Sequence, residues 1–89
     1  MRPIADRTFD FAVRIVKLCT YLKKTPGVSR TLANQLLRSG TSIGANTVEA
    51  KSGQSRRDFL SKLEIALKEA RETEYWLKLL VAADVVSES

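Results

Sequence analysis

Apolar residues recur at steps of three and four along the first part of the chain. One line consists of Phe9, Ala12, Val13, Val16, Cys19 and Thr20, and a second line beside it consists of Phe11, Ile15, Leu18 and Leu22. This spacing predicts an amphipathic helix over about residues 6–24. Because the apolar arc is wide, we expect the helix to contact neighbours on two sides. Pro26 and Gly27 predict where it ends.

The second stretch, about residues 30–51, carries two glycines at helical spacing, Gly40 and Gly44. Each glycine inside a helix costs about 1 kcal/mol relative to alanine. Four residues apart, they form a strip of small residues that lets another helix backbone approach closely. A loop near Gly40 is the alternative, but apolar spacing persists from Leu36 to Val48 and favours a continuous helix. Ser29 is its expected N-cap.

The third stretch, about residues 56–82, has the clearest periodicity. Ser55 and Asp58 resemble a capping box at its start. A heptad-like seam is predicted to face the interior, and it consists of Leu60, Leu63, Leu67, Ala70, Glu74, Leu77 and Val81. Phe59, Ala66, Thr73, Trp76 and Leu80 widen this seam. We expect Phe9, Phe11, Phe59 and Trp76 to lie in the core.

Three helical stretches and scarce glycine and proline predict one all-α domain over residues 1–89, an up-and-down antiparallel helical bundle. A chain of 89 residues buries only a modest fraction of its surface. Association with further copies of itself would therefore be a natural way to complete the core. The single cysteine, Cys19, falls among apolar neighbours and is expected to be buried.

The formal charge of +5 is unevenly distributed. Residues 1–57 hold 11 Lys/Arg and 3 Asp/Glu, a net +8, and residues 58–89 hold 4 and 7, a net −3. This asymmetry is compatible with an anionic partner, with head-to-tail contacts between subunits, or with an ordinary solvated surface. Candidate contacts to an RNA or DNA backbone are Arg14, Lys17, Arg38, Lys51, Arg56 and Arg57.

Catalytic chemistry is poorly represented in the sequence. There is no histidine, no phosphate-binding glycine motif and no Cys/His metal pattern. We therefore expect no enzyme activity, metal, cofactor or small-molecule substrate. Glu49 is expected to form a structural ion pair with Arg38 or Lys51, although a pocket joining Glu49 to unpaired Ser or Lys would favour catalysis. Without a signal peptide or an apolar run of about 18 residues, the expected location is the cytoplasm, with no membrane contact.

Two motifs resemble a known family. The segment QLLRSGTSIGANTVEA at residues 35–50 and the segment from Asp58 to Leu77 are similar to the two signatures of the bacterial four-helix bundle proteins. This family includes proteins encoded in intervening sequences of 23S ribosomal RNA genes. Residues 9–22 also resemble its first helix, so the resemblance extends over roughly residues 7–81. The segment at 35–50 is the more specific of the signatures.

The resemblance implies an up-and-down helical bundle that assembles into a ring-like homopentamer. A related branch, the accessory proteins of diversity-generating retroelements, forms a basic pentameric barrel that binds nucleic acid and a reverse transcriptase. No catalytic residues can be transferred. The residues expected to serve helix packing or assembly are Gln35, Ser39, Gly40, Ser42, Ile43, Gly44 and Asn46. The family continues into a fourth helix, which we expect to be missing here because the chain ends where that helix should begin.

Overall fold

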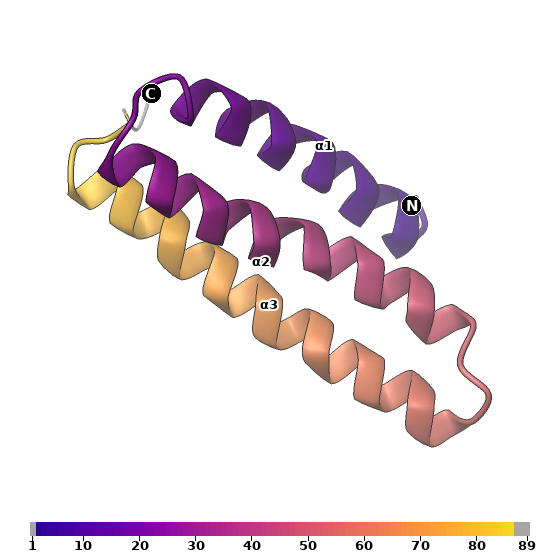
Figure 1. The fold of residues 1–89 in the computed structure, drawn as a ribbon. Helices are drawn as coiled ribbons and strands as arrows, with labels where there is room; N and C mark the ends of the chain where they lie inside the picture. Colours follow the sequence, from indigo (N-terminus) through magenta and orange to yellow (C-terminus); the bar gives the residue numbers. More distant parts are fainter. Residues whose placement is uncertain (1, 87–89) are drawn as a thin grey trace.

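Three helices make up the computed structural model, which describes residues 2–86. They are α1 (Ile4–Leu22), α2 (Val28–Lys51) and α3 (Arg56–Ala82), and no strand occurs among the described residues. Consecutive helices run in opposite directions and are joined by short turns (Figure 1). The predicted all-α, antiparallel architecture is therefore confirmed. The expectation about a fourth helix concerns residues beyond those described.

The ends of the helices differ in part from the prediction. Helix α1 begins and ends two residues earlier than expected. At its end the chain leaves the helix in a turn, in which the Lys24 backbone N–H donates to the Tyr21 carbonyl at 3.2 Å. The predicted N-cap Ser29 is wrong. Gly27 holds that position with a φ of +97°, and its carbonyl accepts from the backbone N–H groups of Arg30 and Thr31. A positive φ of this size is readily adopted only by glycine.

Helix α3 begins where the sequence predicted. The Ser55 side chain accepts a hydrogen bond from the Asp58 backbone N–H at 3.1 Å. This bond satisfies one of the N–H groups that the first turn of a helix leaves without a partner. At the other end, the chain turns back after Ala82. The backbone N–H groups of Val85 and Val86 both donate to the Leu80 carbonyl, which brings the two valines against the core.

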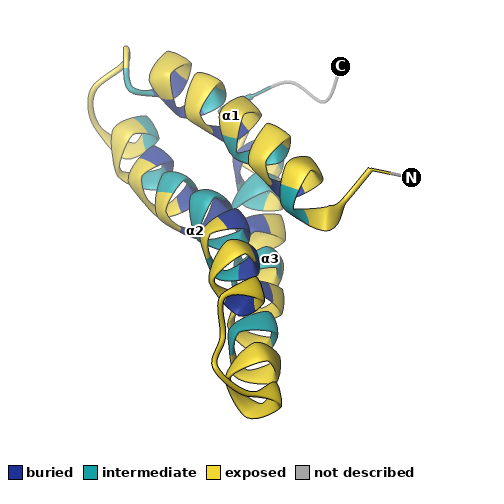
Figure 2. Ribbon diagram, turned by 90° about the vertical axis from the view of Figure 1, so that its right-hand side faces the viewer, coloured by how far each residue is buried: buried dark blue, intermediate teal, exposed yellow. Residues whose placement is uncertain are grey.

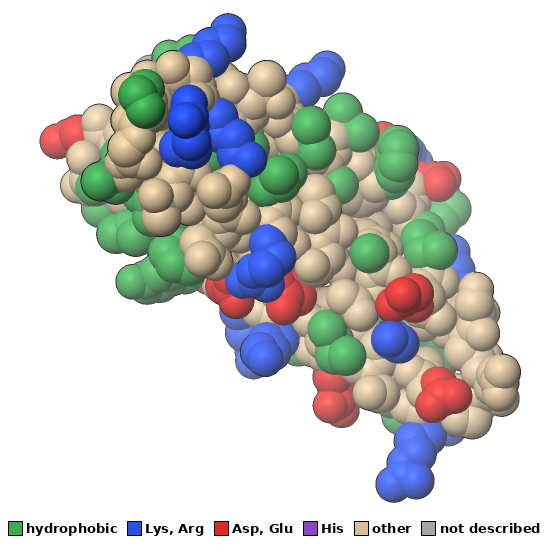
Figure 3. Space-filling model, viewed as in Figure 1, with side chains coloured by type: hydrophobic (Ala, Val, Ile, Leu, Met, Phe, Trp, Pro, Cys, Tyr) green, Lys and Arg blue, Asp and Glu red, His purple; other side chains and the backbone are tan. Residues whose placement is uncertain are grey.

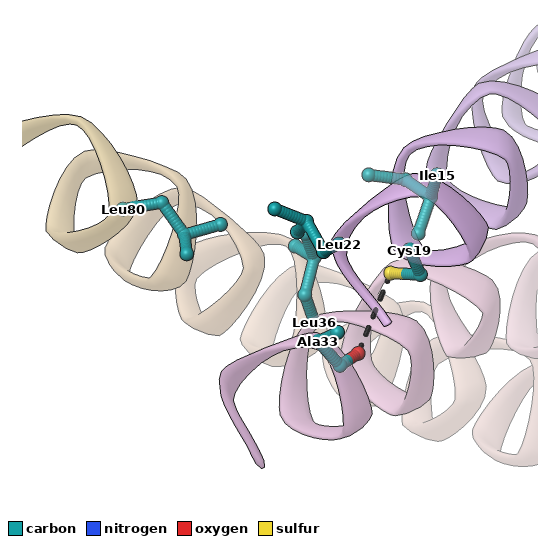
Figure 4. Close-up of a cluster of buried hydrophobic side chains, with 6 residues drawn as sticks. All are labelled: Ile15, Cys19, Leu22, Ala33, Leu36 and Leu80. Atoms are coloured by element: carbon teal, nitrogen blue, oxygen red, sulfur yellow. Dashed lines mark hydrogen bonds between the residues drawn. The ribbon is translucent and has the colours of Figure 1, made fainter. Parts of the chain in front are cut away.

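Helix α2 lies between the other two helices. It packs against both α1 and α3, whereas the backbones of α1 and α3 make no close contact within residues 2–86. The buried positions lie mainly on the sides of the helices that face one another (Figure 2). The core cluster takes residues from every helix and consists of Ile15, Cys19, Leu22, Ala33, Leu36 and Leu80 (Figure 4). The Cys19 thiol donates to the Ala33 carbonyl at 3.4 Å, which joins α1 to α2.

Helix α2 is continuous through both glycines, so the alternative of a loop near Gly40 is wrong. Gly40 and Gly44 are buried and face α1. A Cβ added at Gly40 would lie 2.8 Å from Ile15 Cγ2, and one at Gly44 would lie 3.4 Å from the Thr8 carbonyl oxygen. The glycines therefore permit a close approach between α1 and α2 of one chain, and α1 already occupies the small-residue strip.

The buried line of α1 takes Ile15 and Leu22 from one predicted apolar line and Cys19 from the other, and it leaves the line of Phe9, Val13 and Val16 exposed. Ile15, Cys19 and Leu22 are each at most 3% exposed, whereas Phe9 is 66% exposed and Val16 45% exposed. The expectation that Phe9 belongs to the core is wrong. Among residues 2–86, α2 is the one helix whose backbone lies close to α1, and it covers one side of α1 and leaves the Phe9 line uncovered.

The predicted seam of α3 is correct only in part, because the buried residues belong to the line that was expected to widen it. Leu60 and Leu67 are 45% and 53% exposed, and the buried positions are Ala66, Thr73 and Leu80, which lie seven residues apart. Phe59, expected in the core, is 41% exposed, whereas Phe11 and Trp76 do pack against the core cluster. The predicted repeat of seven residues is correct. The line of residues that faces α2 lies beside the predicted leucine seam, and two of its three buried residues, Ala66 and Thr73, have smaller side chains than leucine.

Candidate functional site

The small residues in the middle of α2 contact both neighbouring helices. Gly40 and Gly44 face α1, and Ser39, which is fully buried, faces α3. The Thr73 hydroxyl donates to Ser39 Oγ at 3.0 Å. The Ser39 hydroxyl donates to the Leu36 carbonyl at 3.4 Å, and the Glu69 carbonyl, 2.8 Å from Thr73 Oγ1, is the alternative acceptor for the single Thr73 proton. This buried polar contact favours one position of α2 along α3, because a shift of either helix would break the hydroxyl–hydroxyl bond between them.

The other residues predicted for packing or assembly are less buried. Gln35 is exposed, and Ser42, Ile43 and Asn46 are half-buried. The Asn46 amide donates to the Ser42 carbonyl at 2.8 Å, and the Ser42 hydroxyl donates to the Arg38 carbonyl at 2.7 Å. These bonds remain within α2. Among the residues predicted for packing or assembly, interhelical contacts are thus seen for the two glycines and Ser39.

Arg38 is held by two carboxylates of α3. Its guanidinium donates to Glu69 Oε2 at 3.1 Å and also to Glu72 Oε2. Trp76 Nε1 donates to the same Glu72 oxygen at 3.0 Å. Arg38, expected to contact nucleic acid, therefore links α2 to α3 in this chain. Its partners lie 31 and 34 residues away in sequence, so no local pattern identified them.

Glu49 pairs with Lys62 of α3 at 3.3 Å, so its predicted pairing with Arg38 or Lys51 is wrong. The two side chains line a hollow of about 440 Å³ beside the α2–α3 turn, together with Ser52, Asp58 and Ser61 among others. This hollow does place Glu49 near serines. However, Glu49 and Lys62 are 58% and 41% exposed and satisfy each other. The desolvation that activates catalytic carboxylates and amines is therefore lacking.

The remaining basic candidates do not form one surface. Lys51, Arg56 and Arg57 lie at the turn between α2 and α3, and all three are exposed. Arg14 and Lys17 are also exposed but lie in the second half of α1, away from that turn (Figure 1). On the face shown in Figure 3, Lys and Arg side chains are scattered, and several stand beside acidic ones.

An exposed apolar surface on α1 was not identified from the sequence as a site. Phe9, Val13 and Val16 are 66%, 37% and 45% exposed and share one face of α1. A hollow of about 370 Å³ borders this line, between α1 and α2, and is lined by Ala5, Phe9, Ala12, Thr41, Gly44, Ala45 and Val48. Hydrophobic side chains gather along α1 and its boundary with α2 (Figure 3). The width of the apolar arc was the available signal.

Two further findings concern the described residues alone. Within residues 2–86 there is no group of three or more His, Cys, Asp or Glu side chains that could hold a metal ion. None of the three helices in that range combines the length and apolar character needed to cross a bilayer.

Burial raises the pKa of the Cys19 thiol, which keeps it protonated inside the core.

The fold and these contacts define an all-α antiparallel helical protein in which a middle helix carries a buried small-residue strip. The family model described as 23S rRNA-intervening sequence protein matches residues 3–89. The chain belongs to that family.

A solved structure is similar over nearly the whole chain. It is the crystal structure of a protein with unknown function from the S23 ribosomal protein family of Bacteroides thetaiotaomicron VPI-5482. The two are 50% identical with a TM-score of 0.88, and the alignment covers 97% of this chain and 79% of that one. Among curated proteins, no match was found.

Proposed function

We propose that this protein acts without catalysis, as a helical module that binds further copies of itself and presents a repeated surface to other molecules. The observation that carries the proposal is the exposure of large apolar side chains along α1, where Phe9 is 66% and Val16 45% exposed. Contiguous exposed apolar surface on a small protein is typical of an interaction site. The small core adds to this, because a domain of this size gains stability when copies associate.

The two glycines of α2 do not support this proposal, since α1 of the same chain fills the strip that they form. Support comes instead from the side of α1 that faces away from α2. A helix with one buried and one exposed apolar line is typical of subunits that assemble, because the second line is covered only in the complex.

The mass of the protein in solution tests the proposal. One chain has a mass of 9.9 kDa, and the ring of five implied by the family resemblance would have about five times that mass, 50 kDa. Light scattering coupled to size exclusion at micromolar concentration is the measurement. We expect a mass of several chains, and a monomer at that concentration would refute the proposal.

A second candidate function is binding of RNA or DNA through the phosphate backbone. It is favoured by the net charge of +5 and by exposed Lys51, Arg56 and Arg57, which lie together at the α2–α3 turn and form no ion pair among residues 2–86. Binding of this kind is independent of sequence and weakens as salt rises.

Affinity for a random single-stranded RNA between about 50 and 200 mM salt tests this second candidate. Replacing Arg56 and Arg57 with Gln should weaken binding and reduce the slope of log affinity against log salt by about one to two units. Arg38→Gln is the matched control, since Glu69 and Glu72 already neutralise that charge. Undetectable binding at low salt, or an equal effect of Arg38→Gln, would exclude this surface.

A further inference from the structure

We infer that α1 is a detachable cover on a stable α2–α3 hairpin. In this inference α1 opens as one unit about the turn of residues 23–27, while α2 and α3 remain packed against each other. Opening exposes the small-residue strip of α2 and the buried side chains beside it. The inference goes beyond the proposed function, because it stands on contacts within one chain.

The polar contacts between helices join α2 to α3. They are the hydrogen bond from Thr73 to Ser39 and the ion pairs Arg38–Glu69, Arg38–Glu72 and Lys62–Glu49. Among residues 2–86, the side chains of α1 donate one hydrogen bond to α2, from the Cys19 thiol to the Ala33 carbonyl, and form no ion pair with it. A thiol is a weak donor, so directional contacts contribute little to the attachment of α1.

The helical tendency of the two outer helices also differs. Nine of the 19 residues of α1 are β-branched or aromatic, against six of the 27 residues of α3. Such side chains lose rotamer freedom in a helix and weaken it. Pro3 holds the N-cap position of α1 without a side-chain cap bond, whereas Ser55 caps α3. Helix α1 therefore depends on its packing against α2, and we expect it to lose its helical structure and its packing together.

The packing of α1 is one-sided. Its inner residues Ile15, Cys19 and Leu22 are buried, whereas Phe9 on its outer side is 66% exposed. Helix α3 also packs on α2 alone, but it does so over 27 residues and with the polar contacts described above (Figure 1). Opening of α1 removes the burial of one line of side chains and leaves the polar contacts of the hairpin intact.

The open state differs from the closed protein at a defined surface of α2. Ala33 and Leu36 have no exposed surface in the closed structure, and Gly40 and Gly44 lie against α1. Small residues at helical spacing allow another helix backbone to approach closely. The position of α1 therefore controls the exposure of this face, and the thiol of Cys19 becomes accessible in the same event.

Native-state hydrogen exchange of the full chain, followed by mass spectrometry, tests the inference. Where closing is faster than chemical exchange, the protection of an amide reports the free energy of the opening that exposes it. We expect the most protected amides of α1 to be at least tenfold less protected than those of α2 and α3. Equal protection in the three helices would overturn the inference, because the chain would then open only as a whole.

Two variants identify which contacts the opening breaks. Thr73→Val weakens a contact that persists when α1 is open, so it should lower the protection of α2 and α3 about fivefold and leave that of α1 unchanged. Ile15→Val is the matched variant, which removes one carbon atom from a buried side chain of α1. Its packing is lost in every open state, so it should lower protection in all three helices by the same factor, about two- to tenfold.

The opposite patterns overturn the inference. If Thr73→Val lowers the protection of α1 as much as that of α2 and α3, then α1 opens only with the rest of the chain. If Ile15→Val spares α3 instead, then α3 is the helix that detaches. Arg38→Gln repeats the test at an exposed contact and should act as Thr73→Val does, with a smaller effect. A lack of effect of both variants on α2 and α3 would show that these contacts do not hold the hairpin.

Alkylation of Cys19 gives an independent measurement of the same event. Its rate relative to the unfolded protein should follow the α1 amides and should not change in Thr73→Val. A labelling rate that rises with the exchange of α3 would count against the inference. All variants are compared at one protein concentration, because association shifts apparent stability. A wild-type monomer would refute the proposed function and leave this inference intact.

Discussion

The close approach of α1 to α2 at Gly40 leads to a quantitative prediction for Gly40→Ala. The added Cβ would lie 2.8, 3.0 and 3.3 Å from Cγ2, Cγ1 and Cβ of Ile15, well inside the 3.5–4.0 Å at which carbon atoms attract. Ile15 is β-branched and has one strongly preferred χ1 rotamer in a helix, so its side chain cannot turn away. Because Ile15 Cβ is itself too close, the two helices must move apart.

The net effect is the difference between two terms. Overpacking a core typically destabilises by about 1–3 kcal/mol. Replacing glycine with alanine inside a helix stabilises by about 1 kcal/mol, partly by reducing the freedom of the unfolded chain. We therefore expect Gly40→Ala to lower the free energy of unfolding by up to about 2 kcal/mol.

Gly44→Ala is the matched control on the same helix. Its nearest new contacts would be the Thr8 carbonyl oxygen and Oγ1, both at 3.4 Å, which is close to ordinary van der Waals distance. The helix-propensity gain should dominate here, and stability should be unchanged or up to about 1 kcal/mol higher. Urea unfolding followed by circular dichroism at 222 nm, at one fixed protein concentration, measures both variants.

A second background isolates the clash. Ile15→Ala removes the two closest crowding atoms, Cγ2 and Cγ1, and keeps Cβ at 3.3 Å, so Gly40→Ala should be less destabilising there than in the wild type, and sucrose can keep this weakened background folded. If Gly40→Ala is more stable than the wild type, or has the same effect in both backgrounds, the close contact with Ile15 does not govern stability.

Three further predictions concern the contacts around α2 and the buried thiol. Thr73→Val should destabilise the fold by about 1 kcal/mol, because Ser39 loses its buried hydroxyl partner, and urea unfolding checks this. Arg38→Gln should lower stability by at most about 1 kcal/mol at low salt and by less in 1 M NaCl, since the side chain is 49% exposed. Since burial raises the pKa of Cys19, the folded thiol should react with an aromatic disulfide reagent at pH 8 far more slowly than the urea-unfolded one. The same shift stabilises the fold below the unfolded thiol pKa of about 8.5, and this contribution is lost as pH rises through the higher folded value.

The sequence by itself determined the three helices and placed each of their ends within two residues. Apolar spacing, the Pro26–Gly27 turn and the Ser55 cap are local features, because each acts within one helix or one turn of the chain. The burial of Cys19 also followed from its apolar neighbours. The expectation that the middle helix needs a close neighbour at its glycines had a local basis too, since two helix-weakening residues at one face require compensation.

Tertiary structure alone decided which face of each outer helix is buried and which residues pair across helices. α1 and α3 each carry two adjacent apolar lines, and periodicity cannot choose between them. The choice follows from the position of α2 between them, which covers the Ile15 line on α1 and the Ala66–Thr73–Leu80 line on α3. The same arrangement brings Arg38 to Glu69 and Glu72, and it leaves Phe9 exposed. Such pairings depend on the packing of distant segments, for which the spacing along one helix holds no information.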